Sequence, residues 1–392
     1  MNRVSSLIMT FMFLGSIIII GGIMLLKPDR IKSEVENRNL SQKPVISHQD
    51  ILSGGYFNKF EEYFNDQFLA RDLLIKTYTK LQLELNRTVV NNTVIAKNGW
   101  LMELPIASVK RSHYHESIQQ VNELERFLTN KDISIYLALA PHKKNILAHL
   151  YPAHLKNNAG ARGRQYFVNE ISSKIHYINL NELFQSKYST KQLEDMYFKT
   201  DHHWNIKGAH TAYQYIISQL EEDLKDLKQP ISNFDIKCNN DARFIGSYNR
   251  RLFGLKDYDF EYVCGYFPSD QSNLISFKAS NATGKVFEHM EEVFGRGINS
   301  KELRYSNLSS NDFAEIHFHY RNSSSNNLLI LKDSYANPIV PFLAKHFSKT
   351  FVLDLRHYNR MNVYDYIEKH NINAVLILYN DSNLSGELYS FK

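Results

Sequence analysis

The sequence has little of what marks several protein classes. Its 392 residues include two cysteines, Cys238 and Cys264, too few for a disulfide framework and without metal-site spacing. They can pair if this part of the chain lies outside the cytoplasm, or remain two inert buried thiols, and the sequence leaves both open. The net charge is only +5, without long runs of one sign, and internal repeats and low-complexity tracts are absent. Neither a nucleic-acid partner nor a polybasic membrane patch is therefore indicated.

One long hydrophobic run is present near the amino terminus. Residues 7–26 carry no charge, and as a helix they would be about 30 Å long, which matches the hydrocarbon thickness of a bilayer. Cleaved signal peptides usually have a shorter apolar region and a small-x-small exit, which this run lacks. We therefore predict an uncleaved membrane anchor over residues 1–27, although cleavage is not settled by the sequence. Basic residues flank both ends, so charge alone leaves the orientation open.

The remaining chain divides by composition. Residues 28–53 are polar and predict a linker between the anchor and a folded domain. From residue 54 we predict one domain that continues to residue 392. It begins with apolar residues at helical spacing, and we expect one break in this helix near Asp66. Residues 230–325, rich in Asn, Ser, Gly and Tyr, predict a mixed insertion of strands and loops within this domain.

An alternation of helices and strands predicts an α/β fold. Residues 117–128 have helical spacing, and residues 133–140 form an apolar run typical of a buried parallel strand. The last 65 residues, from Leu328 on, give a βαβαβ pattern that ends with a strand over residues 374–379. Such a pattern favours a parallel sheet covered by helices on both faces.

The stretch Thr200-Asp201-His202-His203-Trp204 places a carboxylate beside two imidazoles. With Asp201 two residues before His203, the carboxylate can orient the imidazole while His203 acts as a base. His202 then points elsewhere, as a structural histidine or a substrate-binding one. Trp204 either walls the site and stacks on a sugar or simply packs in the core.

A second stretch supplies a hydroxyl. An apolar strand runs from Leu328 into Ser334, which precedes a predicted helix. This arrangement presents a Ser at the edge of a sheet where α/β proteins bind ligands, and its amide can donate to an oxyanion. Seen alone, such a Ser is usually a helix cap. Together with Asp201 and His203 it completes the set of groups that activated-serine chemistry requires.

The same residues allow a metal interpretation. Asp201, His202, His203 and His210 could be ligands, and His317 and His319 share a face of a predicted strand. Adjacent histidines rarely bind one ion together, because neighbouring side chains diverge. We therefore predict no metal and no cofactor.

Several motifs together resemble a known family. They are Asp201-His202-His203-Trp204, Lys332-Asp333-Ser334-Tyr335-Ala336, the run 354–359 and Leu378-Tyr379-Asn380. In these the chain resembles the DHHW proteins, relatives of the SGNH-hydrolase-like alginate O-acetylation proteins of the AlgX and AlgJ type. The likeness covers most of the chain from about residue 55. It implies an SGNH-hydrolase-like α/β/α sandwich, held at the cell membrane by one amino-terminal transmembrane helix, with the domain outside the cytoplasm.

The resemblance also implies roles for residues. Ser334 would be the nucleophile, His203 the base and Asp201 its partner. The Gly-Asp-Ser of ordinary SGNH enzymes is Lys332-Asp333-Ser334 here, and their Gly-x-Asn-Asp block is not evident. Arg356 and Asn380 each follow a strand near the carboxyl edge of the sheet, so we take them as candidate oxyanion or substrate-binding groups. Their alternatives are a surface ion pair and a turn residue.

The function implied is an O-acetyltransferase that passes acetyl through an acyl-serine to a polysaccharide of the cell wall or the extracellular matrix. The resemblance implies a further partner, a multipass MBOAT acyltransferase that supplies the acyl group. Two alternatives remain. One is a carbohydrate acetylesterase with the same triad, and the other is a non-catalytic polysaccharide-binding or assembly protein. The sequence identifies neither the polysaccharide nor the oligomeric state.

Overall fold

The computed structural model describes residues 3–33, 35–36, 38–224, 226–239, 241–256, 261, 263–321 and 324–392. Two compact units make up the chain. The first consists of residues 1–91 with 250–256, and the second of residues 92–249 with 257–392. The helices of the predicted domain that lie before residue 91 thus belong to the first unit. The predicted start of the domain at residue 54 stays a prediction.

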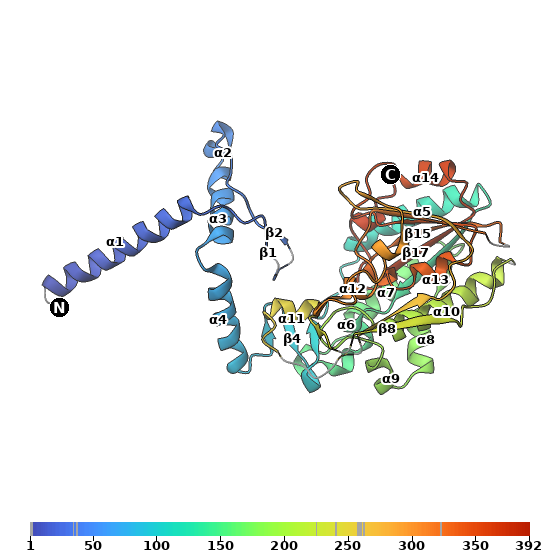
Figure 1. The fold of residues 1–392 in the computed structure, drawn as a ribbon, viewed down its shortest axis with the longest axis horizontal. Coiled ribbons are helices and arrows are strands. Elements are labelled where there is room, and N and C mark those ends of the chain that lie inside the picture. Colours follow the sequence, from blue (N-terminus) through green and yellow to red (C-terminus); the bar gives the residue numbers. More distant parts are fainter. Residues whose placement is uncertain are drawn as a thin grey trace. The chain divides into compact units, whose positions relative to one another are not determined.

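The first unit begins with helix α1 (Arg3–Leu26), which makes up most of the predicted membrane anchor of residues 1–27 (Figure 1). Its mean hydropathy reaches 2.4, so it is long and apolar enough to cross a bilayer. The predicted amphipathic helix is present as α3 (Gly55–Gln67) and α4 (Arg71–Glu84), with the expected break between them.

The predicted linker, residues 28–53, contains regular secondary structure. It contains β1 (Lys32–Ser33), β2 (Arg38–Asn39) and the short helix α2 (His48–Leu52). Arg38 donates two hydrogen bonds to the carboxylate of Asp66 on α3, at 2.5 and 2.7 Å. The pair lowers the pKa of Asp66 to about 2, chiefly through the hydrogen bond from Arg38. Residues 28–53 are thus tied to α3 by polar contacts that composition alone does not reveal.

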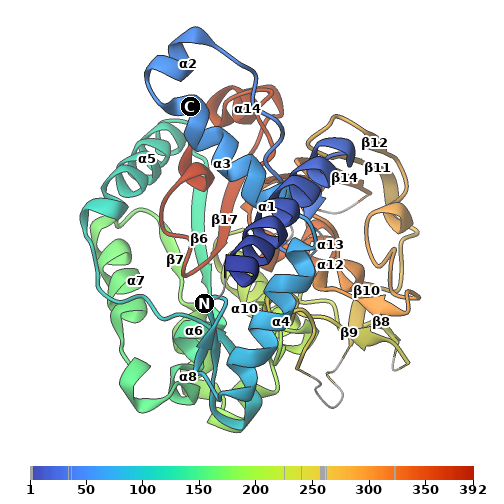
Figure 2. The same cartoon turned by 90° about the vertical axis from the view of Figure 1, so that its left-hand side faces the viewer.

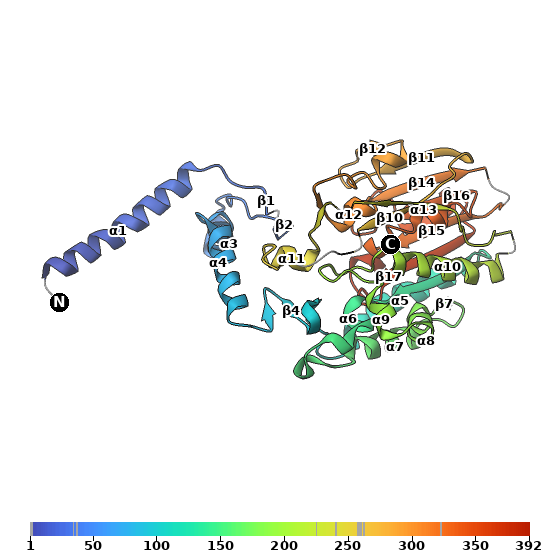
Figure 3. The same ribbon diagram turned by 60° about the horizontal axis from the view of Figure 1, so that its bottom comes forward.

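The second unit is built on a sheet of eight strands within the described residues, in the order β12-β11-β14-β16-β15-β17-β6-β7. Figure 3 shows β12, β11, β14, β16, β15 and β17 in this sequence. The strands are β6 (Ser134–Ala140), β7 (His176–Ile178), β11 (Leu274–Ser280), β12 (Val286–Phe287), β14 (Glu315–Tyr320), β15 (Asn327–Lys332), β16 (Lys349–Leu353) and β17 (Ala374–Asn380).

The pairing of these strands confirms the predicted parallel sheet. β15 pairs in parallel with both β16 and β17, β17 with β6, and β6 with β7. Five of the six residues of β15 are buried, as are all seven of β17, as expected for strands covered on both faces. The carboxyl ends of these parallel strands therefore meet at one edge, where ligands bind in such folds.

Helices cover both faces of this parallel part. The helices named here are α5 (Ser112–Thr129), α7 (Ala159–Glu170), α8 (Leu180–Lys187), α10 (Ile206–Asp223), α13 (Val340–Ala344) and α14 (Val363–Lys369). Figure 1 shows α5 and α14 on one face and α10 on the other, and Figure 2 shows α5 and α7 on the same side of β6. The result is the three-layer α/β/α arrangement that was predicted.

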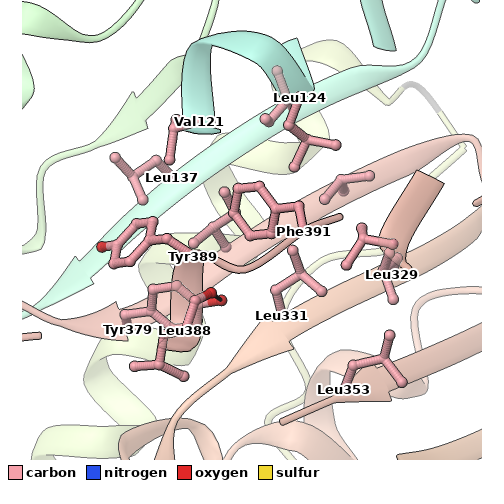
Figure 4. Close-up of a cluster of buried hydrophobic side chains, with 14 of the residues drawn as sticks. Val121, Leu124, Leu137, Leu329, Leu331, Leu353, Tyr379, Leu388, Tyr389 and Phe391 are labelled. Atoms are coloured by element: carbon pink, nitrogen blue, oxygen red, sulfur yellow. Dashed lines mark hydrogen bonds between the residues drawn. The ribbon is translucent and has the colours of Figure 1, made fainter. Parts of the chain in front are cut away.

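The core on the α5 face is a continuous apolar cluster. Val121 and Leu124 of α5 pack against Leu137 of β6 and Leu331 of β15, with Phe391 near the carboxyl terminus (Figure 4). All five side chains are fully buried. Because alternate residues of each strand enter this cluster, the register of the sheet is fixed, and with it the positions of the residues that follow each strand.

The region predicted as an insertion contributes to the main sheet. β11 and β14 pair antiparallel, and β14 pairs antiparallel with β16, so the sheet is mixed. In the same region β8 (Phe234–Cys238) and β10 (Cys264–Pro268) pair, and the two cysteines form a disulfide. Residues 240, 257–260, 262, 322 and 323 of the predicted insertion lie outside the described residues.

Shorter elements complete the described part of the chain. The remaining strands are β3 (Val89–Val90), β4 (Thr93–Ile95), β5 (Leu101–Glu103), β9 (Arg243–Phe244) and β13 (Glu302–Leu303). The remaining α-helices are α6 (Lys143–Ile146), α9 (Thr190–Glu194), α11 (Ser247–Arg251) and α12 (Tyr305–Leu308). The 3-10 helices are η1 (Lys97–Gly99), η2 (Ala148–Leu150), η3 (Ala153–Leu155), η4 (Met290–Glu292), η5 (Ser334–Ala336) and η6 (Glu387–Tyr389).

Candidate active site

The loop that carries Asp201 and His203 is held from three sides. It ends at Asn205, whose side chain accepts hydrogen bonds from the first N–H groups of α10 and so caps that helix. The buried ammonium of Lys143 donates to the main-chain oxygens of Phe198, Lys199 and Asp201 at 2.7, 3.0 and 2.7 Å. Gly246 approaches the loop so closely that a Cβ there would lie 2.3 Å from the carbonyl carbon of Thr200. The loop therefore has little freedom to move.

Three of the predicted residues meet in one row of hydrogen bonds. His203 Nδ1 lies 2.7 Å from Asp201 Oδ1, and His203 Nε2 lies 2.8 Å from Ser334 Oγ. With the proton on Nδ1, the imidazole donates to Asp201 and its Nε2 accepts from the Ser334 hydroxyl. This is the geometry in which an imidazole can remove a serine proton while a carboxylate holds its other nitrogen.

Asp201 is almost fully buried and remains an acceptor on both oxygens. Its Oδ1 also accepts from the His203 N–H at 3.0 Å, and its Oδ2 accepts from the Ser247 N–H at 2.6 Å. Burial alone would raise the pKa of Asp201, but the charges of His202 and His203 and the hydrogen bonds from His203 and Ser247 hold it well below its usual value. The side chain therefore stays a carboxylate at neutral pH.

Tyr305 clamps the imidazole. Its ring stacks on that of His203 with a centroid distance of 3.6 Å and an angle of 4° between the planes. Its hydroxyl donates to the main-chain oxygen of Ser334 at 3.0 Å. One side chain thus fixes both the plane of the base and the backbone of the hydroxyl-bearing residue.

Ser334 begins the 3-10 turn η5 directly after β15, rather than the longer helix that was expected. The preceding Asp333 is fully buried and fixes this turn, since it accepts from the N–H of Tyr335 and from the N–H and amide of Asn380. Burial raises the pKa of Asp333. Within the described residues the N–H of Ser334 donates no hydrogen bond, so it is available to a ligand.

The candidate oxyanion groups Arg356 and Asn380 are engaged with carboxylates. Arg356 donates from Nε and Nη2 to Asp354 at 2.8 and 2.6 Å. Asn380 donates its amide to Asp333 at 2.6 Å and accepts from the Ser382 N–H. Among the described residues no hydrogen bond joins either side chain to Ser334, and a role at the substrate stays a prediction for both.

Arg356 belongs to a larger group that we call the ion cluster: Asp312, Lys332, Asn337, Asp354 and Arg356. The Lys332 ammonium lies 2.9 Å from Asp354 and 2.8 Å from Asn337 Oδ1, and both Lys332 and Asp354 are buried. Burial would raise the pKa of Asp354, but Lys332 and Arg356 lower it. Every charge of the buried pair thus has a partner of opposite sign.

Trp204 and His202 take different positions. Trp204 is fully buried, and its Nε1 donates to the main-chain oxygen of Tyr335 at 3.0 Å, so it packs in the core. His202 is about a third exposed, its Nδ1 lies 2.8 Å from Ser247 Oγ, and its ring lies 3.7 Å from that of His203. Of the two, only His202 combines proximity to His203 with access to solvent.

Among the described residues, two groups of side chains have the spacing to hold a metal ion. One is Asp201, His202 and His203, and the other is Asp312, Asp354 and His357. In the first, Asp201 and His203 already bond to each other, and His203 also bonds to Ser334. In the second, Lys332 and Arg356 supply cations to both carboxylates. His210, another predicted candidate ligand, lies among aromatic rings. His317, also a candidate, contacts the carboxylate of Glu315.

Sequence reasoning missed Tyr305 and Lys143. Tyr305 lies in the region predicted as an insertion, and no local pattern signals that its ring meets His203. Lys143 follows β6 in the segment Ala140-Pro141-His142-Lys143. A polar residue soon after a buried parallel strand lies near the edge where ligands bind, and this position could have indicated Lys143. His142, in the same segment, is buried with its ring 6.2 Å from that of His202. Burial lowers the pKa of His142 well below its usual value, so this ring stays neutral.

Comparisons of sequence give two kinds of match. The family model described as "SGNH hydrolase-like domain, acetyltransferase AlgX" matches residues 93–264. The "Probable alginate O-acetylase AlgJ" of Pseudomonas aeruginosa is 24% identical over 201 residues, which are 50% of this chain and 50% of that protein. The chain spans about half the length of the curated relatives it matches.

Comparisons of structure extend the likeness over most of the chain. The structure of Bacillus cereus PatB1 is 35% identical with a TM-score of 0.70, covering 75% of this chain and 98% of that one. A second PatB1 structure, with a sulfonyl adduct, is 34% identical with a TM-score of 0.71 and covers 77% and 100%. A DHHW family protein from Eubacterium siraeum shares the fold at 18% identity and a TM-score of 0.57, covering 76% and 94%.

Proposed function

Because the chain belongs to the SGNH-hydrolase-like family of AlgX, AlgJ and the DHHW proteins, a class of acyltransferase enzymes, we propose that it transfers acetyl to a polysaccharide through Ser334. The observation that carries the proposal is the row of two hydrogen bonds that joins Asp201, His203 and Ser334. A sulfonyl adduct, as in the PatB1 structure, is the kind of product that activated nucleophiles form with sulfonylating reagents.

The proposed reaction has two halves. In the first, Ser334 Oγ attacks the carbonyl carbon of an acetyl donor while His203 Nε2 takes the hydroxyl proton, and His203 then gives that proton to the departing donor group. In the second, His203 takes the proton of a sugar hydroxyl, whose oxygen attacks the acetyl-serine. The acetyl moves to the sugar, and the proton returns from His203 to Ser334. Asp201 stabilises the imidazolium in both halves.

The developing oxyanion requires hydrogen-bond donors. We assign the first to the N–H of Ser334, because it is unengaged within the described residues and adjoins the reacting carbon in an acyl-serine. Arg356 and Asn380 would have to leave Asp354 and Asp333 to act as the second, and His202 remains a further candidate for substrate binding.

We further propose that the reaction takes place outside the cytoplasm, at the membrane. The apolar helix α1 supports an anchor, and the disulfide between Cys238 and Cys264 suits an oxidising compartment. An acetyl donor in such a compartment has to arrive through the membrane, which supports the multipass MBOAT acyltransferase as the supplier. The acceptor would be a wall or extracellular polysaccharide.

The test uses the full chain in detergent with a chromogenic acetyl ester, in the presence of a chelator. We expect Ser334→Ala and His203→Ala each to lower the release of acetyl by at least about 10³-fold. Mass spectrometry of the intact protein should show one acetyl group on the wild type and none on Ser334→Ala. In the presence of an oligosaccharide acceptor, the amounts of free acetate and of acetylated sugar are then compared. A transferase forms mainly acetylated sugar, whereas an esterase forms mainly acetate.

Ser218→Ala is the matched control, since Ser218 lies on α10 and its hydroxyl bonds only to the main chain of its own helix. It should match the wild type. Activity that survives both Ser334→Ala and His203→Ala would refute the proposal, as would activity that the chelator abolishes.

A further inference from the structure

A polar hollow of about 530 Å³ lies beyond the end of the sheet's edge strand β7. It lies between α7 and α8, and the side chains that line it and matter here are Arg164, Gln165, Tyr177, Asn179, Asn181 and Gln185. Its volume falls within the roughly 300–1,000 Å³ of small-ligand pockets. None of these residues takes part in the row of Asp201, His203 and Ser334.

One buried atom of a lining residue lacks a partner. Asn181 is 2% exposed, its amide donates to the main-chain oxygen of Leu139 at 3.4 Å, and its Oδ1 accepts no hydrogen bond within the described residues. A buried carbonyl oxygen left unsatisfied costs free energy, so native proteins usually provide it with a donor. A ligand with an N–H or O–H group would supply that donor.

The cation of the hollow is already paired. Arg164 donates from Nη1 to the buried Asp381 at 2.7 Å, and Glu182, the acidic residue of the lining, accepts from the neutral amide of Asn179 at 3.0 Å. Within the described residues, the lining therefore offers no unpaired cation to an anionic ligand. The amides of Gln165 and Gln185 and the half-buried ring of Tyr177 instead offer hydrogen bonds and a face for stacking. This combination suits a neutral sugar.

The hollow is connected to the candidate active site. Asp381 accepts from the N–H of His142 as well as from Arg164, and the adjoining Asn380 donates to Asp333, next to Ser334. Between β15 and β7 lie three strand spacings of about 4.8 Å, or about 14 Å along one sheet edge. A short oligosaccharide is long enough to cover this distance.

We propose that this hollow binds a neutral, hydroxyl- or acetamido-bearing sugar unit of the acceptor glycan, several positions away from the sugar that reacts. The inference rests on the proposed function, because it supplies the acceptor for the acetyl group of Ser334. Asn181 Oδ1 accepts from the sugar, Arg164 donates to one of its oxygens, and Tyr177 contacts the ring face. Binding away from the reacting hydroxyl would hold the polymer while the acetyl group is transferred.

The experiment measures the binding of cellotetraose and of chitotetraose, the tetrasaccharide of N-acetylglucosamine, to the full chain by calorimetry. The detergent has a polyoxyethylene head group, since a glycoside detergent would compete. We expect at least one tetrasaccharide to bind, and Gln165→Ala combined with Gln185→Ala to raise its Kd about tenfold, the effect of one or two lost hydrogen bonds. Both side chains are exposed, so the variant should fold.

Gln119→Ala is the matched control. Gln119 is an exposed glutamine on α5 that donates to Glu123 four residues later, as Gln165 on α7 donates to Asn169. It lies outside the hollow, and its variant should bind as the wild type does. If neither tetrasaccharide binds the wild type at millimolar concentration, or if the hollow variant binds as well as Gln119→Ala, the inference is overturned.

Ser334→Ala separates this inference from the proposed function. We expect that variant to lose turnover of the acetyl ester and to retain its affinity for the tetrasaccharide. Ester turnover that survives Ser334→Ala refutes the proposed function, while the comparison of Gln165, Gln185 and Gln119 variants still decides whether the hollow binds sugar.

Discussion

Two sets of polar side chains, the row of Asp201, His203 and Ser334 and the ion cluster, lie at the carboxyl edge of the parallel sheet. They differ in whether their hydrogen bonds lead to a nucleophile or only pair opposite charges. In the row of Asp201, His203 and Ser334, each proton has a neighbouring acceptor, and the last group is a nucleophilic hydroxyl. In the ion cluster, the ammonium of Lys332 and the guanidinium of Arg356 face the carboxylate of Asp354, and these groups pair opposite charges without a hydroxyl among them.

The comparison shows that burial and charge do not by themselves identify an active site. Both groups contain side chains with shifted pKa values, and each contributes two side chains to a set of three with the spacing of metal ligands. What distinguishes the first is a hydroxyl whose oxygen can attack once its proton has moved. The ion cluster instead joins the ends of β15 and β16, and so fixes the strand that delivers Ser334.

The largest expected effect breaks the row of three at Asp201. In Asp201→Asn the carboxylate no longer selects the proton position of His203, so we expect kcat/KM for an acetyl ester to fall by about 10⁴-fold. The kinetics are measured beside the thermal unfolding of the same variant. A loss smaller than tenfold would show that His203 does not depend on Asp201.

Breaking the ion cluster should instead affect stability. Lys332→Met leaves Asp354 buried with one cation fewer, and we expect the free energy of unfolding to fall by about 3–5 kcal/mol. Denaturant unfolding measures the loss. Lys349→Met, at an exposed lysine of the neighbouring strand β16, should change stability little. Equal stability of the two variants would contradict the role assigned to the cluster.

His210, which lies outside both groups, tests how burial of an imidazole changes the pH dependence of stability. His210 lies among Tyr213, Phe234, Tyr266 and Phe342, its Nε2 has no hydrogen-bond partner in the described residues, and burial lowers its pKa to about 4. Between about pH 6.5 and 4 the unfolded chain binds a proton that the folded chain does not, so stability is lost as the pH falls.

His210→Phe should remove this dependence. We expect the slope of unfolding free energy against pH in that window to decrease by up to one proton, about 1.4 kcal/mol per pH unit. Urea unfolding at several pH values gives the slope. His115→Phe, at an exposed histidine of α5, serves as the control, and an unchanged slope in His210→Phe would contradict the assignment.

The smallest expected effect concerns Tyr305. Tyr305→Phe keeps the ring on His203 but removes the hydrogen bond to the main chain of Ser334, so we expect kcat/KM to fall only about two- to tenfold. Tyr305→Leu, which also removes the stacked ring, should fall further. If Tyr305→Phe were as damaging as Asp201→Asn, the hydroxyl rather than the ring would be the main contribution.

Much of the architecture could be predicted because its signals are local. β15 and β17 are apolar over nearly their whole length, as parallel strands buried on both faces must be. Asp201 and His203 are two residues apart, and Ser334 follows one of those strands. Their residue types therefore indicated the chemistry, and their positions in the sequence indicated where the site lies. The family resemblance added the expectation that they act together.

The rest required contacts that the sequence does not display. β14 alternates between half-buried and buried residues, because one of its faces is left partly open, and this pattern does not show which sheet the strand joins. Tyr305 meets His203 from about a hundred residues away. Whether Cys238 and Cys264 face each other depended on the register of β8 and β10, which places them directly opposite.

The position of β15 has a consequence for how the protein is made. Both neighbours of this strand, β16 and β17, follow it in the chain. A chain that has been synthesised only as far as α13 already contains Asp201, His203 and Ser334, yet it lacks the two strands that hold Ser334 in place. The site can therefore assemble only after β17, which ends at Asn380, has emerged, so premature stops shortly before that residue should yield products as inert as those truncated much earlier.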